Sequence, residues 1–132
     1  MLRRQAKVLS PGQIRALLKH ISDTRHPVRN RVIFLLSLRA GLRAKEIAAL
    51  EWRMITDAEG KIAQTIRLTD VAAKGRSGGV IPMARELRQS LEALRQISRG
   101  PLGRCKVVVT ERSNGTSAQV IINMFAEWYS AL

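Results

Sequence analysis

The stretch that decides the fold is Ala40-Gly41-Leu42-Arg43-Ala44-Lys45-Glu46-Ile47-Ala48-Ala49-Leu50. Gly41 follows a long apolar run and is expected to end the helix that this run predicts. Ala44 to Leu50 then predicts a short helix whose Ile47 and Leu50 face inward. Arg43 stands at the start of that helix, where exposed backbone N–H groups favour an anion such as phosphate.

Four more helices are predicted outward from this stretch. Ser10-Pro11-Gly12-Gln13 is typical of a helix start, with Ser10 as the N-cap and Gln13 completing a capping box. Apolar residues then recur at helical spacing as far as Ile21. The next helix begins at Pro27 and is apolar on most sides, so it is expected to be buried. The remaining two are predicted over 84–98 and from Ser117 to Trp128.

A small sheet is predicted between these helices. Residues 54–56 and 62–68 flank a turn at Asp57-Ala58-Glu59-Gly60, as in a β-hairpin, and Val80-Ile81-Pro82 is a third strand. Residues 107–109 predict a short buried strand or extended segment. The fold class is therefore α+β and mostly helical, with helices around a three-stranded antiparallel sheet. We expect residues 1–132 to form a single domain, with 1–9 as a basic tail.

The charge points to nucleic acid. The chain carries 23 Lys and Arg against 10 Asp and Glu, a net charge of +13, and 17 of the cations are Arg. Arg suits phosphate because its planar fork contacts two oxygens at once. A domain this basic has the electrostatic footprint of a nucleic-acid binder, although a solvated cationic face, a ribosomal-type protein or a membrane-surface protein has similar charge.

Several classes are excluded. No apolar stretch is long enough to cross a bilayer, and no apolar region follows the basic N-terminus as a signal peptide requires. Two His and one Cys offer no metal-ligand spacing, and the glycine-rich loop Lys74-Gly75-Arg76-Ser77-Gly78-Gly79 lacks the order of a P-loop. We expect no cofactor, metal or small-molecule substrate. The single Cys105 cannot form an internal disulfide, so a cytoplasmic, nucleoid-associated location is expected.

Three segments in order, 40–50, 74–83 and Ser113-Asn114-Gly115-Thr116-Ser117, resemble the tyrosine recombinases of the phage integrase type. The resemblance extends from Leu9 onward. It implies the first part of a recombinase catalytic domain that acts in DNA integration and recombination. Arg43 corresponds to the family's first catalytic arginine and Glu46 to its companion acid. Lys74, eight residues before Pro82, corresponds to the catalytic lysine on a β-hairpin.

Elementary chemistry agrees with these roles. Attack on a phosphodiester places negative charge on the non-bridging oxygens, and a fixed guanidinium such as that of Arg43 stabilises this charge. Glu46, one turn on, is expected to hold the guanidinium by charge-assisted hydrogen bonds. By the resemblance, Lys74 donates a proton to the departing 5′ oxygen. We expect Arg76, Lys45 and Ser77 to contact double-stranded DNA, and other recombinase protomers are possible partners.

The sequence also departs from the family pattern. Many relatives have an arginine where this chain has Gly79, and Arg76 is a candidate to serve the same phosphate. The family places a second arginine in a His-x-x-Arg box, a further His or Trp and the tyrosine nucleophile after the lysine, whereas this chain has no His at all after Lys74. His26-Pro27-Val28-Arg29 matches that box by letters but comes too early, so it is expected to be structural. Tyr129 lies in the last helix, where an aromatic is expected to be core.

We therefore expect a chain truncated before the distal catalytic residues, inactive alone. Nine residues before the first helix also cannot supply the separate core-binding domain of relatives. Two other interpretations stay open. One is a non-catalytic DNA-binding or regulatory remnant of an integrase. The other, weaker, is a helix-turn-helix regulator, because residues 40–50 also resemble the first helix of that motif. Taken singly, Arg43 and Glu46 could be a surface pair and Lys74 a solvated loop cation.

Overall fold

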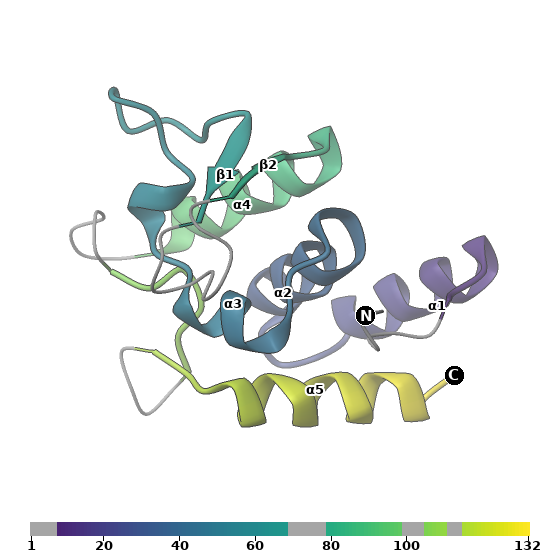
Figure 1. Cartoon of the computed structure of the whole chain (residues 1–132). Coiled ribbons are helices and arrows are strands. Elements are labelled where there is room, and N and C mark those ends of the chain that lie inside the picture. Colours follow the sequence, from purple (N-terminus) through teal and green to yellow (C-terminus); the bar gives the residue numbers. More distant parts are fainter. Residues whose placement is uncertain (1–7, 69–78, 99–104, 111–114) are drawn as a thin grey trace.

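The computed structural model describes residues 8–68, 79–98, 105–110 and 115–132. In this part of the chain, five α-helices pack together with a small two-stranded antiparallel sheet (Figure 1). The helices are α1 (Pro11–Ser22), α2 (Pro27–Ala40), α3 (Ala44–Ala49), α4 (Arg85–Ile97) and α5 (Ala118–Ser130). The strands are β1 (Thr65–Arg67) and β2 (Val80–Pro82), and a short 3₁₀-helix, η1, covers Trp52–Met54. The mostly helical α+β class is confirmed.

The predicted helix starts are confirmed by their hydrogen bonds. At α1, the Ser10 Oγ accepts from the Gln13 N–H at 3.1 Å, and the Gln13 Oε1 accepts from the Ser10 N–H at 3.0 Å. This reciprocal capping box satisfies two backbone groups that the helix itself leaves unpaired. At α5, the Ser117 Oγ accepts from the Val120 N–H at 3.2 Å. Short polar signals therefore fix where these two helices begin.

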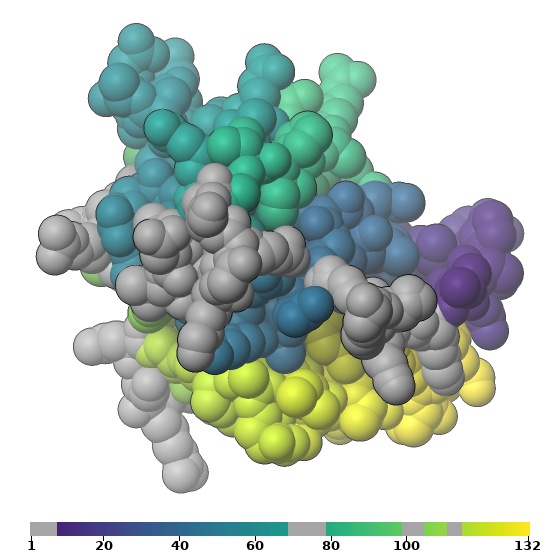
Figure 2. All heavy atoms as spheres, viewed as in Figure 1, coloured from purple at the N-terminus to yellow at the C-terminus, as the bar shows by residue number. Residues whose placement is uncertain are grey.

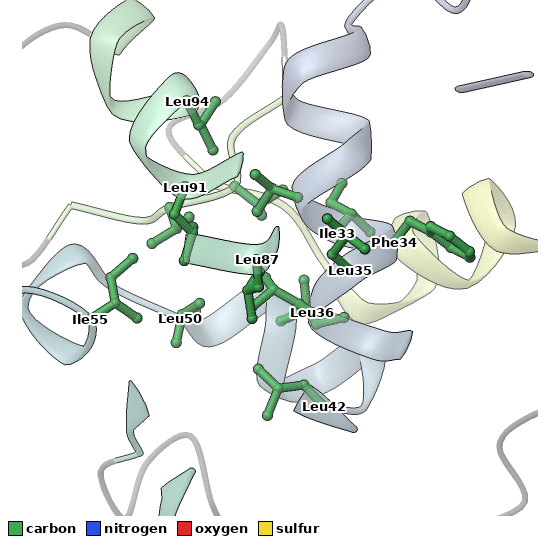
Figure 3. Close-up of a cluster of buried hydrophobic side chains, with 14 of the residues drawn as sticks. Ile33, Phe34, Leu35, Leu36, Leu42, Leu50, Ile55, Leu87, Leu91 and Leu94 are labelled. Carbon is green, nitrogen blue, oxygen red and sulfur yellow. The ribbon is translucent and has the colours of Figure 1, made fainter. Parts of the chain in front are cut away.

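The core is built around α2. Its residues from Val32 to Leu36 are all at most 1% exposed, as the predicted buried helix requires. α2 packs against α1, α3 and α4, while α5 lies against both α3 and α1. Figure 3 shows Leu87, Leu91 and Leu94 of α4 gathered with Leu35 and Leu36 of α2. Burying each such side chain contributes about 1.5–3 kcal/mol.

The sheet is smaller than predicted, because the described residues hold two strands instead of three. Where the first strand was expected, the chain forms η1 and then a single antiparallel bridge between Thr56 and Ile62. Met54 and Ile55 are neighbours, and both are buried. Successive side chains of a strand point to opposite faces, so two buried neighbours favour a helical turn here. The predicted turn persists, with the Asp57 Oδ1 accepting from the N–H groups of Glu59 and Lys61 at 2.9 Å each.

The segment 105–108 pairs with the chain after α3. The Trp52 N–H donates to the Cys105 carbonyl at 3.1 Å, and the Val107 N–H donates to the Leu50 carbonyl at 3.0 Å. Val107 and Val108 are buried, as the sequence predicted, whereas Val109 is exposed. Among the described residues, no helix combines the length and the apolar character that crossing a membrane requires.

Candidate nucleic-acid interface

Arg43 lies at the junction between α2 and α3. The first helix ends at Gly41, whose backbone is left-handed (φ 70°, ψ 24°), a conformation that glycine adopts without steric cost. The N–H groups of Gly41 and Leu42 donate to the carbonyls of Ser37 and Leu36 at 3.1 Å each. Leu42 is buried, and Arg43 then takes an extended conformation as the N-cap of α3, with its side chain exposed. A buried anchor and a glycine stop thus direct Arg43 to the surface.

Glu46 fixes the backbone of this junction. It is 6% exposed, and its Oε1 accepts a hydrogen bond from the Arg43 N–H at 2.9 Å. This is the acidic half of a capping box; a guanidinium has no acceptor atom, so Arg43 cannot supply the other half. The sequence predicted that Glu46 would hold the guanidinium, whereas this bond holds the backbone. The Arg43 segment is therefore positioned while its guanidinium is left exposed.

Two exposed cations, Arg43 and Lys45, lie at this junction. Arg43 and Lys45 are both exposed, and neither side chain forms an ion pair within the part of the chain that the structure describes. An exposed guanidinium without a carboxylate partner retains all its donors for another anion. Arg43 and Lys45 can therefore both bind phosphate without first breaking an internal ion pair.

Arginines on the preceding helix have different surroundings. The Arg39 Nε lies 2.8 Å from the Glu86 Oε1, and the Arg31 Nη2 lies 3.9 Å from the Glu86 Oε2. The Arg31 Nε also donates to the Oγ of the buried Ser90 at 3.0 Å. Sequence reasoning missed this network, because Arg39 and Glu86 lie 47 positions apart and no local pattern links them.

Two paired strands, β1 and β2, flank the segment in which the sequence predicts the catalytic lysine. β1 and β2 pair antiparallel with Ile66 opposite Ile81, and the Leu68 N–H donates to the Gly79 carbonyl at 2.9 Å. The segment between these arms holds the predicted site residues Lys74, Arg76 and Ser77, which lie outside the described residues. Their roles stay predictions.

Two further exposed cations were not singled out from the sequence. Arg67 lies on β1 opposite Val80, and Arg85 is the first residue of α4, shortly after β2 and Met83. Neither forms an ion pair with another described residue. The alternation of buried Ile66 and exposed Arg67 is the signal that could have indicated the first of them.

The arginine of the early His-x-x-Arg sequence has contacts within the fold, in agreement with the structural role predicted for it. Arg29 is half-buried, and its Nε and Nη2 donate to the Asn30 Oδ1 at 3.0 and 2.9 Å. The buried Asn30 in turn donates to the Thr24 Oγ1 at 3.0 Å, and the Arg29 Nη1 reaches the Val109 carbonyl at 3.3 Å. Arg29 thus connects the start of α2 to the segment that precedes α5.

Tyr129 has the surroundings of a core aromatic. It is half-buried on α5, with its ring centroid 5.8 Å from that of Phe125. Burial raises the pKa of Tyr129, because a phenolate loses hydration there. A raised pKa opposes the activation that a nucleophilic tyrosine needs. Among the described residues, no cluster of three His, Cys, Asp or Glu side chains could hold a metal ion.

Solved structures show the same fold. The XerA recombinase matches with a TM-score of 0.67 and 18% identity over 91% of this chain and 41% of that chain. The Tn1549 transposon integrase in complex with circular intermediate DNA matches with a TM-score of 0.61 and 19% identity, over 91% of this chain and 42% of its own. This chain thus spans less than half the length of these structures. No curated protein matches it.

The fold is therefore that of the tyrosine recombinases. The model of the phage integrase family matches residues 7–130, so the chain belongs to the phage integrase family. The match contains all the described residues from Val8 to Ser130, including the junction between α2 and α3.

Proposed function

We propose that this chain binds duplex DNA and supplies part of the active site of a tyrosine recombinase that acts in DNA recombination and integration. One observation carries the proposal: Glu46 positions the Arg43 backbone at a family-matched junction, while the Arg43 guanidinium is exposed and unpaired among the described residues. A guanidinium fixed in this way is suited to a scissile phosphate, because it stabilises the charge that develops during attack.

The roles of the remaining residues follow from the family resemblance. Arg43 binds the non-bridging oxygens, and Glu46 keeps its segment in register with α3. Lys74, between β1 and β2, protonates the departing 5′ oxygen, and Arg76, Lys45 and Ser77 contact the backbone of the duplex. The Tn1549 transposon integrase carries circular intermediate DNA in its structure, which supports DNA as the partner.

A non-catalytic DNA-binding or regulatory role is the alternative. It is supported by the surroundings of Tyr129, because a half-buried tyrosine with a raised pKa is poorly suited to act as a nucleophile. A helix-turn-helix regulator is disfavoured. In the described residues after α3, the chain continues into η1 and β1, where a recognition helix would have to follow.

DNA binding is tested by fluorescence anisotropy with a labelled duplex. Because bound cations displace counterions, a protein with several phosphate contacts loses roughly a thousandfold or more in affinity between about 50 and 200 mM salt. We expect such a loss with little dependence on base sequence. Binding that is insensitive to salt would contradict the proposal.

The catalytic and non-catalytic alternatives are separated by a nicked suicide substrate, which traps a covalent protein–DNA adduct. We expect no adduct from this chain alone, because Tyr129 is a core aromatic with a raised pKa. An adduct that disappears in Tyr129→Phe would show that the last helix carries the nucleophile and that the chain is active by itself.

A further inference from the structure

A second cationic surface lies on α1, away from the junction around Arg43. Residues 1–22 contain five Lys and Arg and no Asp or Glu. Within the described part, Arg15 and Lys19 are exposed on α1, one helical turn apart, and form no ion pair with another described residue. Like charges at this spacing destabilise a helix. An anionic partner would remove that repulsion.

The rest of α1 argues against insertion into a membrane surface. Its apolar residues Leu17 and Ile21 are buried, and Ile14 and Leu18 are packed against the core. The other exposed residues of the helix are small, polar or proline: Pro11, Gly12, Gln13, Ala16 and Ser22. A helix that lies in a membrane needs an apolar face to insert, and α1 has already used its apolar face inside the protein.

The position of α1 suits a long anionic ligand. Figure 1 shows α3 beside the first half of α5 and α1 beside its last half, and α5 contacts both helices. Figure 2 shows α1 at the edge of the molecule, open to solvent. A helix with the 13 residues of α5 is about 20 Å long, at ~1.5 Å per residue. This length corresponds to about six base pairs at ~3.4 Å each.

We propose that Arg15 and Lys19 form a second phosphate-binding surface, which contacts the backbone of duplex DNA to one side of the position bound by Arg43. This inference rests on the proposed DNA-binding function. The contact is independent of base sequence, because two exposed cations on one helical turn recognise phosphate charge and present no pattern of donors and acceptors to base edges.

The test is the salt dependence of binding to a labelled duplex of about three helical turns. The variants are Lys19→Gln, Arg15→Gln with Lys19→Gln, and Lys61→Gln as a control with the same charge change as the single variant. Lys61 is exposed and its N–H bonds to Asp57 of the turn that follows η1. Figure 1 shows the segment between η1 and β1 on the other side of the molecule from α1. Gln preserves helix propensity, and circular dichroism checks the fold.

Removal of one phosphate-binding cation should reduce the slope of log K against log salt by about 0.9. We expect a reduction of about 0.9 for Lys19→Gln, about 1.8 for the double variant and none for Lys61→Gln. A double variant with the wild-type slope, or a Lys61→Gln control with the same reduction as Lys19→Gln, would overturn the assignment to α1.

Two further outcomes are distinct from these. A wild-type chain that does not bind DNA overturns both the proposed function and this inference. The second outcome is that the wild type binds vesicles of phosphatidylserine and phosphatidylcholine, that the double variant does not, and that the double variant keeps the wild-type salt slope for DNA. This result overturns only the inference and assigns α1 to an anionic membrane.

Discussion

Arg39 and Arg43 are one helical turn apart in sequence and have opposite surroundings. Arg39, in the last turn of α2, lies 2.8 Å from Glu86 and shares that carboxylate with Arg31. Arg43, beyond the glycine stop, has no carboxylate partner among the described residues. Pairing with Glu86 offsets the charge of the first region and ties α2 to α4. The unpaired junction keeps its charge for a ligand, so the two regions contribute differently although both count toward the net charge of +13.

The α2–α4 contact derives most of its stability from its apolar layer. The Glu86 side chain is 32% exposed and those of Arg31 and Arg39 are 43% and 39% exposed. Ion pairs with this much solvent access typically contribute about 0.2–1 kcal/mol. Leu87, the neighbour of Glu86, is completely buried. Glu86 therefore helps to orient α4 on α2, while the buried leucines of α4 supply most of the stability of that contact.

The largest expected effect tests this division of roles. Leu87→Ala should lower the free energy of unfolding by about 2–5 kcal/mol, because it removes buried methyl groups and leaves a cavity between α2 and α4. Urea denaturation followed by circular dichroism measures the loss. At temperatures where the variant is still folded, DNA affinity should be unchanged. A loss of less than about 1 kcal/mol, as for an exposed ion pair, would contradict the claim that the apolar layer supplies most of the stability of the α2–α4 contact.

Substitution at the unpaired junction should have the converse effect. Arg43→Ala should weaken DNA binding about ten- to a hundredfold, since a charge-assisted hydrogen bond contributes about 1.5–3 kcal/mol, and leave the unfolding transition unchanged. Lys74→Ala should behave similarly. Arg39→Ala is the matched control, because it removes the same side chain from a paired position four residues away. Anisotropy titration and thermal denaturation are measured for all three.

The contrast between the two arginines fails if Arg39→Ala weakens DNA binding as much as Arg43→Ala does, since pairing would then be irrelevant to binding. If Arg43→Ala or Lys74→Ala unfolds the domain, that residue is structural and its assignment to the site is wrong.

A smaller effect is expected at the acid of the paired region. Glu86→Gln should reduce the free energy of unfolding by less than about 1 kcal/mol, because the amide oxygen still accepts a hydrogen bond but the charge is removed. DNA affinity should not fall, since Arg31 and Arg39 are released from their carboxylate. Chemical denaturation and titration of the same duplex provide the two values. A fall in affinity would show that Glu86 aligns the DNA-binding surface.

The sequence could predict those helix ends that are determined by a few residues close by in the chain. Ser10 and Gln13 define the start of α1, and Gly41 defines the end of α2, because capping and left-handed backbone depend on a few neighbouring residues. The positions of Arg43 and Glu46 at the start of α3 could be predicted in the same way, while their roles in the site stay predictions. Lys74, Arg76 and Ser77 lie outside the described residues, so their placement stays a prediction.

Contacts between residues far apart in the sequence could not be predicted from the sequence. Glu86 meets Arg39 only once α4 has docked on α2, and no sequence pattern encodes that pairing. The expected first strand, 54–56, is replaced by a 3₁₀ turn and a single bridge, because Met54 and Ile55 are both buried, which overrides their local preference for a strand. The bond from the Arg43 N–H to the Glu46 carboxylate was also not predicted, because the sequence expectation concerned the guanidinium.

The smallest expected effect comes from a second carboxylate with cationic partners, Glu51. Its Oε1 lies 2.6 Å from the Arg53 Nε, and its Oε2 lies 3.7 Å from the Lys106 Nζ. The hydrogen bond from Arg53 holds the pKa of Glu51 below its ordinary value, with smaller contributions from the charges of Arg53 and Lys106.

A lowered folded-state pKa adds stability above the ordinary pKa of about 4.3, and this stability is lost as the pH falls through the lower folded value. The free energy of unfolding of the wild type should therefore exceed that of Glu51→Gln by a few tenths of a kcal/mol at neutral pH. The difference should vanish toward pH ~3, as measured by urea denaturation along a pH series. A difference that is the same at every pH would mean that the charge of Glu51 is not what stabilises its pairs with Arg53 and Lys106.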